Sequence, residues 1–403
     1  MSGSIVIVGA GLAGSRAAEA IREYGHAGPV LMLGAEQAWP YQRPALSKEV
    51  LRDERVTLPS LWLQPERFYS EQRIEVRRGV IATALSLEKQ HVALSSGEAV
   101  SWDRLIIATG SSPRRLAVPG AHLPGVRSVR TWEDAVALRE DLRPGSRIVV
   151  IGGGLLGLEV ASAAKERGAH ATVLERGSAL LSRSLGALAG AALTPFIEAM
   201  GVMVRLRTQV ERVLGATRVE GVLSTFGEVH AADLVVVALG AEPAIGWLAG
   251  SGLTLGDGVV VDEFGRTSAP GVFAAGDVAS PWSPSLGRRL RVESYGFAAQ
   301  HGFSVGQNAV GAMEATFPNP SGSTELFGKR LQFSGEHQGD ETCHLMGEPA
   351  RGRFVALLGR GGLLVGRVTL GQPHTFGVLK ACLGQTMARA FEILGEAKPV
   401  EAR

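Results

Sequence analysis

The sequence predicts an α/β protein with two similar parallel-sheet units, one inserted in the other, and a small carboxy-terminal α+β domain. A glycine-rich strand–turn–helix pattern near the amino terminus returns 143 positions later, from Gly9 to Gly152, and the character of the chain changes after about Phe317. At roughly 150 residues per domain, a chain of 403 residues has room for two or three domains.

The first copy of the pattern begins with a β-branched run over residues 4–8, which favours a buried parallel strand. Residues 9–14 then read GAGLAG, and an alanine-rich helical stretch continues to about Tyr24. A second strand over 30–33 leads to Glu36. The segment is therefore a βαβ unit with the glycine fingerprint of a dinucleotide-binding Rossmann-like fold and an acid in the expected place.

The second copy repeats each of these elements. A strand over 147–151 precedes GGGLLG at 152–157, a helix follows over 158–167, and a second strand over 171–174 ends at Glu175. In such a unit the first glycine makes the turn, the second lets a pyrophosphate touch the backbone, and the third lets helix and strand pack closely. The helix amino terminus attracts the phosphates, and the acid accepts hydrogen bonds from the ribose. Two copies predict two bound dinucleotides.

Composition excludes several other classes of function. Lys and Arg total 41 against 39 Asp and Glu, and this balance argues against a nucleic-acid partner. The two cysteines, Cys343 and Cys382, form neither a CxxC pair nor a zinc set, and the nine histidines show no metal-ligand spacing, so no metal site is expected. With no long apolar run and no export signal, the sequence predicts a cytoplasmic protein without a membrane partner.

Further motifs give the chain a resemblance to a known family. Residues 103–110 read DRLIIATG, 234–240 read LVVVALG, and 271–277 read GVFAAGD. Together with the two fingerprints, they resemble the pyridine-nucleotide-dependent flavoprotein reductases over residues 4 to about 310. Residues 39–48 read WPYQRPALSK, similar to a segment of the ferredoxin and rubredoxin reductases that serve bacterial oxygenases. The disulfide reductases of this class carry a CxxxxC pair instead, and no cysteine precedes Cys343 here.

The resemblance implies FAD in the first unit and a nicotinamide in the second. It divides the chain into an FAD-binding domain (1–114 and 243–317), an inserted NAD-binding domain (115–242) and the carboxy-terminal α+β domain (318–403). It implies FAD contacts at Gly9, Gly11, Leu12, Ala13, Gly14, Glu36, Arg43, Lys48, Val80, Ala108, Thr109, Gly110, Arg130, Gly276, Asp277, Glu293, Ser294 and Tyr295. It implies NAD contacts at Gly152, Gly154, Leu155, Leu156, Gly157, Glu159, Glu175 and Gly240.

Three of these residues have specific expected roles. In the family the lysine that matches Lys48 lies beside flavin N5 with the matching arginine, Arg43, nearby, and a cation there favours the anionic reduced flavin. Glu159 resembles the glutamate that reaches the nicotinamide. The alternatives are ordinary solvated charges for Lys48 and Arg43, and a first-turn helix acid for Glu159. Acid–base catalytic side chains are not expected, because hydride transfer needs none.

The preference for one nicotinamide follows from Glu175. A carboxylate at the end of the second strand bonds a free ribose 2′-hydroxyl and repels a 2′-phosphate, which favours NADH over NADPH. Arg176 follows directly and either softens this preference or is simply solvated.

The last segment departs from the family. After a linker-like stretch over 317–323, turns are expected at Gly335, Gly339 and Gly352, a hairpin over 354–358 and 363–368, and a helix over 375–383. The Trp-rich segment ending in SDQ that usually opens this domain is absent, since residues 324–331 read TELFGKRL. The family's E-x-W segment reads Glu293-Ser294-Tyr295, so the expected aromatic wall beside the flavin is thinner.

The sequence thus favours an NADH-dependent, FAD-containing reductase that passes single electrons to a [2Fe–2S] ferredoxin serving a Rieske oxygenase or cytochrome P450. Two alternatives remain at this stage: a reductase for rubredoxin, quinone or oxygen, and an NADH-sensing flavoprotein. A docking face for an acidic ferredoxin is expected at Arg288, Arg289 and Arg291, with Arg114 and Arg115, unless these form an ordinary solvated basic face. The oligomeric state stays open between a monomer and a weak dimer.

Overall fold

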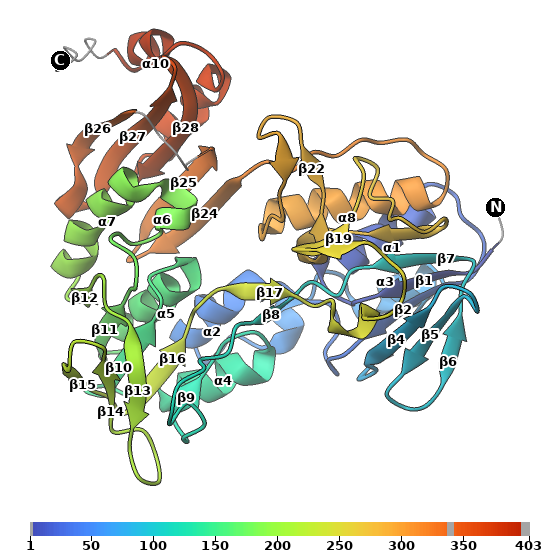
Figure 1. Ribbon diagram of the computed structural model, residues 1–403, viewed down its shortest axis with the longest axis horizontal. Helices are drawn as coiled ribbons and strands as arrows, with labels where there is room; N and C mark the ends of the chain where they lie inside the picture. The colour runs from blue at the N-terminus through green and yellow to red at the C-terminus, as the bar shows by residue number, and fades with distance from the viewer. Residues whose placement is uncertain (1–2, 337–341, 396–403) are drawn as a thin grey trace. The chain divides into compact units, whose positions relative to one another are not determined.

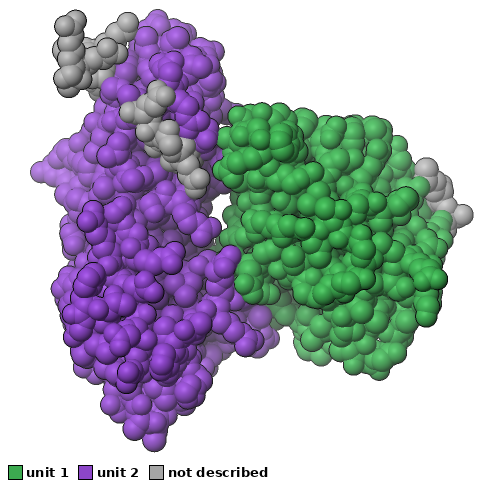
Figure 2. All heavy atoms as spheres, in the orientation of Figure 1, with its two compact units in different colours: residues 1–45, 55–112, 241–319 green, residues 46–54, 113–240, 320–403 purple. Residues whose placement is uncertain are grey.

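A computed structural model describes residues 3–336 and 342–395. The chain forms two compact units, which Figure 2 distinguishes by colour: residues 1–45, 55–112 and 241–319 make the first, and 46–54, 113–240 and 320–403 the second. Each unit contains a five-stranded sheet whose strands are all parallel. The predicted α/β class, with two Rossmann-like domains and a small α+β domain, is confirmed.

The parallel sheet of the first unit has the order β20-β7-β1-β2-β3. Its two faces bury alternate residues: Ile5 and Ile7 pack on the helix side, and Val6 and Val8 on the side of an antiparallel three-stranded meander. The sheet strands are β1 (Ile5–Val8), β2 (Val30–Gly34), β3 (Ile74–Arg78), β7 (Arg104–Ile107) and β20 (Val272–Ala274), and the meander is β4 (Ala82–Ser86), β5 (His91–Leu94) and β6 (Ala99–Ser101).

Two long helices, α1 (Leu12–Glu23) and α8 (Tyr295–Ala309), lie side by side on the helix face (Figure 1). Glycines make this approach close, since a Cβ at Gly302 would lie 2.3 Å from the carbonyl oxygen of Ala13. The first unit also holds α3 (Glu66–Glu71), a small sheet of β18 (Leu255–Gly256), β19 (Gly258–Val260) and β21 (Ala279–Ser280), and a hairpin of β22 (Trp282–Ser283) and β23 (Arg288–Arg289). Short strands β8 (Ser111–Pro113) and β17 (Ala241–Pro243) stand where the chain passes from one unit to the other.

The second unit repeats the layers, with the sheet order β12-β11-β10-β16-β9. Val149 and Ile151 of its central strand pack under a second meander, while a Cβ at Gly157 of α5 would lie 3.2 Å from Val150 on the opposite face. The sheet strands are β9 (Val126–Arg127), β10 (Arg147–Ile151), β11 (His170–Leu174), β12 (Met203–Arg205) and β16 (Leu234–Val237), and the meander is β13 (Val210–Leu214), β14 (Gly221–Ser224) and β15 (Val229–Ala231). The helices are α2 (Glu49–Arg52), α4 (Trp132–Asp141), α5 (Leu155–Glu166), α6 (Ser182–Leu185) and α7 (Ala187–Ala199).

Residues 46–54, which carry α2, belong to the second unit although they follow the first fingerprint in sequence. An ion pair ties this segment to α5, because Arg52 Nε lies 2.8 Å from Glu166 Oε2. The domain bounds expected from the sequence place the whole of 1–114 in one domain, whereas residues 46–54 group with the second unit.

The carboxy-terminal domain is an antiparallel sheet of order β24-β25-β28-β27-β26, with apolar residues of its helices buried on one face. The expected hairpin is present, and β24 begins at Ser321, inside the expected linker. The expected helix over 375–383 divides into α9 and a 3₁₀ turn over 379–382, and Gly377, near the end of α9, weakens the helix there. The turn expected at Gly339 lies outside the described residues. The bounds are β24 (Ser321–Leu326), β25 (Lys329–Gly335), β26 (Thr342–Glu348), β27 (Arg353–Arg360), β28 (Leu363–Leu370), α9 (Pro373–Val378) and α10 (Met387–Leu394).

Over residues 3–336 and 342–395, every helix is too short or too polar to cross a bilayer.

Candidate dinucleotide sites

The three glycines of the first fingerprint have different surroundings. Gly9 has φ +119°, and a Cβ there would lie 2.1 Å from the carbonyl oxygen of Ala108, while a Cβ at Gly14 would lie 1.9 Å from the carbonyl oxygen of Gly9. Gly11, in contrast, would place a Cβ in open space, with no protein atom within 4 Å. The packing of the unit therefore requires the first and third glycines, and the second leaves a bare stretch of backbone facing outward.

The second fingerprint has the same arrangement. Cβ atoms at Gly152 and Gly157 would lie 2.3 Å from the carbonyl oxygen of Ala238 and 2.1 Å from that of Gly152, and one at Gly154 would meet nothing within 4 Å. In both units a twelve-residue helix begins at the next residue, Leu12 or Leu155, with no side-chain cap and no acid in its first turn. Bare backbone at an uncapped helix amino terminus is a binding site for a phosphate group, so both turns fit a dinucleotide.

Other predicted FAD residues gather at the same edge of the first sheet. Ala108, Thr109 and Gly110 directly follow β7, and Thr109 Oγ1 donates to the Ala244 carbonyl oxygen over 2.9 Å. The turn that holds Asp277 follows β20 and lies against α1, since a Cβ at Gly276 would be 2.7 Å from the Cβ of Ala13. Parallel strands bring their carboxyl ends to one edge, which explains this gathering. Asp277 sits in a single 3₁₀ turn over 276–278 and not at the start of a long helix, because α8 begins only at Tyr295.

Glu36 follows β2 and is held by two neighbours. Tyr41 Oη donates to its Oε2 over 2.6 Å, and Arg43 Nη2 donates to its Oε1 over 2.5 Å. The Val80 amide donates to the Gly34 carbonyl oxygen over 2.8 Å, so an adenine contact at Val80 has to use its carbonyl oxygen or side chain.

In the second unit, Glu175 binds the fingerprint loop itself. Its Oε2 accepts the Gly153 amide over 2.7 Å and its Oε1 accepts the Gly177 amide over 2.5 Å. A carboxylate has about four acceptor positions, so two remain for a ribose. Gly240, which follows β16 with φ +84°, belongs to this unit as well. Arg130 also lies in this unit, two residues before α4, with its amide donating to Asp134 Oδ2 over 2.9 Å.

The structure brings together Lys48 and Glu159, which sequence reasoning considered separately. Lys48 Nζ lies 2.9 Å from Glu159 Oε1, and the two side chains are 15% and 9% exposed. Ser47 and Thr324 also donate to the Glu159 carboxylate. Ser47 belongs to the motif over 39–48, but sequence reasoning gave neither residue a role. No sequence signal predicts these contacts, because they join positions 112 and 165 residues apart.

The expected docking arginines differ in their surroundings. The Arg291 side chain is 6% exposed and pairs with Asp257 and Glu293, at 3.0 and 2.5 Å. The expectation that Arg291 belongs to an exposed docking face is therefore wrong. Its charge is neutralised within the first unit by two acids. Arg289 is exposed, but its Nη1 donates to the carbonyl oxygens of Val261 and Ser280.

Four docking candidates are exposed: Arg288 and Arg289 in the first unit, and Arg114 and Arg115 in the second. Glu293, a predicted FAD contact, forms an ion pair with Arg291. Ser294 stands at the amino end of α8, and Tyr295, its first residue, is 45% exposed.

His301 is a buried residue of the first site that sequence reasoning missed. Its side chain lies in α8, 1% exposed, and its Nδ1 accepts the amide of Gly276 over 3.3 Å. Burial lowers the pKa of His301 to about 4, so the imidazole is neutral at physiological pH. A single histidine inside a helix carries no sequence signal for such a contact.

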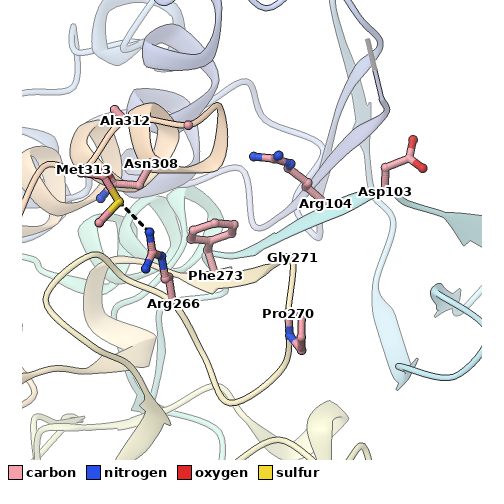
Figure 3. Close-up of a pocket in the computed structure, with 10 residues that line it drawn as sticks. Asp103, Arg104, Arg266, Pro270, Gly271, Phe273, Asn308, Ala312 and Met313 are labelled. Atoms are coloured by element: carbon pink, nitrogen blue, oxygen red, sulfur yellow. Dashed lines mark hydrogen bonds between the residues drawn. The ribbon is translucent and has the colours of Figure 1, made fainter. Parts of the chain in front are cut away.

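A separate hollow of about 520 Å³ lies at the opposite edge of the first sheet, at the start of β7 and β20 (Figure 3). Arg104, Arg266 and Phe273 are among its lining residues. It is not part of the first dinucleotide site, because the fingerprint turn of this unit stands at the carboxyl ends of the strands.

Comparison with known proteins identifies the family. The family model described as pyridine nucleotide-disulphide oxidoreductase matches residues 3–310. The chain belongs to this family. The predicted resemblance, which covered residues 4 to about 310, is confirmed, and the protein is an oxidoreductase. As a pyridine nucleotide-disulphide oxidoreductase it departs from the family name in one respect: Cys343 and Cys382 form no disulfide, and neither lies in the matched region.

Individual relatives of this oxidoreductase extend over most of the chain. The biphenyl dioxygenase system ferredoxin–NAD(+) reductase component of Paraburkholderia xenovorans (strain LB400) is 37% identical over 89% of this chain and 87% of its own length. The benzene 1,2-dioxygenase system ferredoxin–NAD(+) reductase subunit of Pseudomonas putida is 38% identical over 91% and 88%. Among solved structures, the covalent putidaredoxin reductase–putidaredoxin complex matches with a TM-score of 0.91 and 30% identity, over 98% of each chain.

Proposed function

We propose that this protein is an FAD-containing NADH:ferredoxin reductase that serves a bacterial Rieske oxygenase or a cytochrome P450. The observation that carries the proposal is the pair of bare-backbone turns at Gly11 and Gly154, each directly before an uncapped helix. Two dinucleotides in one chain are what electron transfer between a nicotinamide and a flavin requires. The relatives named ferredoxin–NAD(+) reductases support ferredoxin as the acceptor.

The cofactors divide between the units in this proposal. FAD occupies the turn at Gly11, in a domain of residues 1–114 and 243–317 of which 46–54 group with the second unit, and NADH the turn at Gly154, in a domain of residues 115–242. When bound, the flavin supplies the ability to accept a hydride and release electrons singly, which nicotinamide lacks. The chain supplies binding and orientation: Glu36 and Glu175 hold the riboses, and the turns hold the pyrophosphates. The carboxylate of Glu175 favours NADH, because it repels a 2′-phosphate.

Lys48 and Arg43 are the proposed flavin-tuning cations. The ion pair of Lys48 with the buried Glu159 gives its ammonium a defined position. A cation at the flavin ring stabilises negative charge as it develops there. Since hydride transfer needs no proton donor from the protein, no side chain is assigned an acid–base role.

Arg288 is the arginine of the first unit that best fits docking of an acidic ferredoxin. It is exposed on β23, whereas the Arg291 guanidinium pairs with two acids and Arg289 bonds backbone carbonyls. Charge complementarity of this kind raises association rates more than affinity. We place the reaction in the cytoplasm, where NADH is available to such reductases.

Anaerobic stopped-flow mixing tests the proposal. The purified protein should be yellow, should lose its flavin absorbance when mixed with NADH, and should then reduce a [2Fe–2S] ferredoxin. A colourless protein that takes up no added FAD contradicts the proposal, as does a flavin that NADH never reduces. A long-lived reduced complex that passes no electrons to ferredoxin, rubredoxin, quinone or oxygen would instead identify an NADH sensor.

A further inference from the structure

The carboxylate of Glu159 is the centre of a buried polar cluster in the second unit. Glu159 is 7% exposed and lies in the first turn and a half of α5. Its Oε1 lies 2.9 Å from Lys48 Nζ and accepts Thr324 Oγ1 over 2.5 Å, and its Oε2 accepts Ser47 Oγ. The three donors come from two segments far from α5 in sequence: residues 46–54, and β24 of the carboxy-terminal domain.

A buried carboxylate needs such donors, because removal of an ionised group from water is costly unless it is paired and hydrogen-bonded. The two hydroxyl donors also fix the orientation of the Glu159 carboxylate. Because one hydroxyl binds each oxygen, the carboxylate plane has little freedom to rotate. Lys48 is a flexible four-carbon chain ending in a point charge, so its position depends on the anion it meets. The orientation of Glu159 therefore sets the position of the Lys48 ammonium.

Thr324 is placed for this contact by the alternation of β24. Thr324 is 4% exposed, while Ser323 and Glu325 on either side face solvent. The following turn is also bound to α5, since the Phe327 amide donates to Ser162 Oγ over 3.0 Å. This strand replaces the aromatic SDQ segment that the resemblance led us to expect, so the contact belongs to this chain's own carboxy-terminal sequence.

The geometry points to Thr324 as a positioning residue that, with Ser47, orients Glu159 and through it holds the Lys48 ammonium for the redox reaction. This inference rests on the proposed function, in which the Lys48 ammonium tunes the flavin. Loss of the Thr324 hydroxyl leaves Oε1 to Lys48 alone. The ammonium then sits more tightly on the carboxylate and stabilises negative charge on the flavin less well.

The test compares Thr324→Val, which has nearly the same shape without a hydroxyl, with Thr324→Ser, which keeps it. In Thr324→Val we expect NADH to reduce the flavin about tenfold more slowly, a factor that corresponds to ~1.4 kcal/mol of transition-state stabilisation. The dissociation constant for NAD⁺, measured by calorimetry, should change by less than about threefold, since most of that affinity comes from the pyrophosphate and ribose contacts. The flavin midpoint potential should fall in Thr324→Val and stay at the wild-type value in Thr324→Ser.

Ser323→Ala is the matched control, because Ser323 neighbours Thr324 and faces solvent; it should behave as wild type. Ser47→Ala provides a second route to the same carboxylate if Thr324→Val does not fold, and it should also slow reduction. In a double-mutant cycle, Thr324→Val should add little to Glu159→Gln, because both act through one group.

Two results would overturn the inference: a midpoint potential and reduction rate in Thr324→Val equal to wild type, or a Thr324→Ser variant as impaired as Thr324→Val. Full additivity with Glu159→Gln would do the same. Each of these leaves the proposed function intact, since that depends on whether the wild-type protein holds FAD and is reduced by NADH.

Discussion

Arg43 donates from Nη2 to Oε1 of Glu36 over 2.5 Å, so an arginine expected beside the flavin is bound to the acid expected to hold its ribose. Tyr41 Oη occupies the other carboxylate oxygen. The acid of the first fingerprint thus has a fixed orientation before any ligand arrives, and preorganisation of this kind lowers the entropy that binding must overcome.

Glu36→Ala should weaken FAD binding by about tenfold or more, because charge-assisted hydrogen bonds contribute ~1.5–3 kcal/mol each. The measurement is the FAD dissociation constant of the apoprotein by fluorescence titration. Glu75→Ala, the control, removes an exposed acid that pairs with Arg77. If Glu36→Ala holds FAD as tightly as wild type, Glu36 is not the ribose acid.

Gly11→Ala and Gly154→Ala should separate the two dinucleotide sites. Neither new methyl group meets protein, so each variant should fold, with a loss of stability of about 1 kcal/mol or less. Gly11→Ala should bind FAD poorly, whereas Gly154→Ala should keep FAD and show a raised KM for NADH, because each methyl group occupies the space of one pyrophosphate.

Gly14→Ala and Gly157→Ala are the contrasting variants of the same helices. Their methyl groups would meet backbone oxygens at 1.9 and 2.1 Å, so we expect strong destabilisation in thermal unfolding.

For the first pair of variants, loss of FAD from Gly154→Ala together with normal FAD in Gly11→Ala would reverse the assignment of the two units.

The free energy of unfolding should fall as pH is lowered from about 6.5 to about 4, with His301 as one cause. The pKa of His301 is about 4 in the folded protein and 6.5 in the unfolded chain, so between these values only the unfolded chain takes up the proton. The contribution of His301 is therefore complete above pH 6.5 and lost on acidification, by about 3 kcal/mol in all at 1.36 kcal/mol per pH unit.

His301→Asn should remove this part of the pH dependence. Asparagine Oδ1 takes the place of Nδ1 and accepts the Gly276 amide, but it does not titrate. Urea unfolding at pH 7 and pH 4.5 measures the difference, with His122→Asn, a change at an exposed histidine, as the control. Equal pH slopes in wild type and His301→Asn would show that His301 is not buried in its neutral form.

Charge reversal at Arg288 should raise the KM for ferredoxin severalfold, and more at low ionic strength, because exposed charges act over about a Debye length. Steady-state reduction of ferredoxin at two salt concentrations measures this. Arg351→Glu, at an exposed arginine of the carboxy-terminal domain, should leave KM unchanged. A KM for ferredoxin that does not respond to Arg288→Glu at either salt concentration removes this residue from the docking face.

Arg289→Glu should instead lower thermal stability, since the guanidinium of Arg289 bonds two backbone carbonyls.

The parts predicted from sequence are those encoded by short-range patterns. The runs over 4–8 and 147–151 became buried parallel strands, and both fingerprints became turns that open helices. The predicted hairpin over 354–368 also formed, because its glycines and alternating apolar residues are local signals. The exchange of residues 46–54 into the second unit had no such signal, since it depends on pairing of Arg52 with a helix more than one hundred positions away.

The partners of charged residues are likewise set by contacts between distant segments, which the sequence does not reveal. A sequence identifies an arginine but not its partner, so Arg291 was expected on a docking surface, whereas its guanidinium pairs with two acids. His301 and Thr324 drew no attention for the opposite reason: each becomes distinctive only when a backbone amide or a carboxylate is brought to it.

By itself the sequence determined that the chain has two glycine turns with an acid at a set spacing, and therefore the class of ligand and the family. These features depend on backbone conformation and helix dipoles, which act over a few residues. Only the tertiary structure decided which charges are neutralised and which donors surround Glu159, because those contacts join segments 111 to 165 positions apart and exist only when the chain has folded.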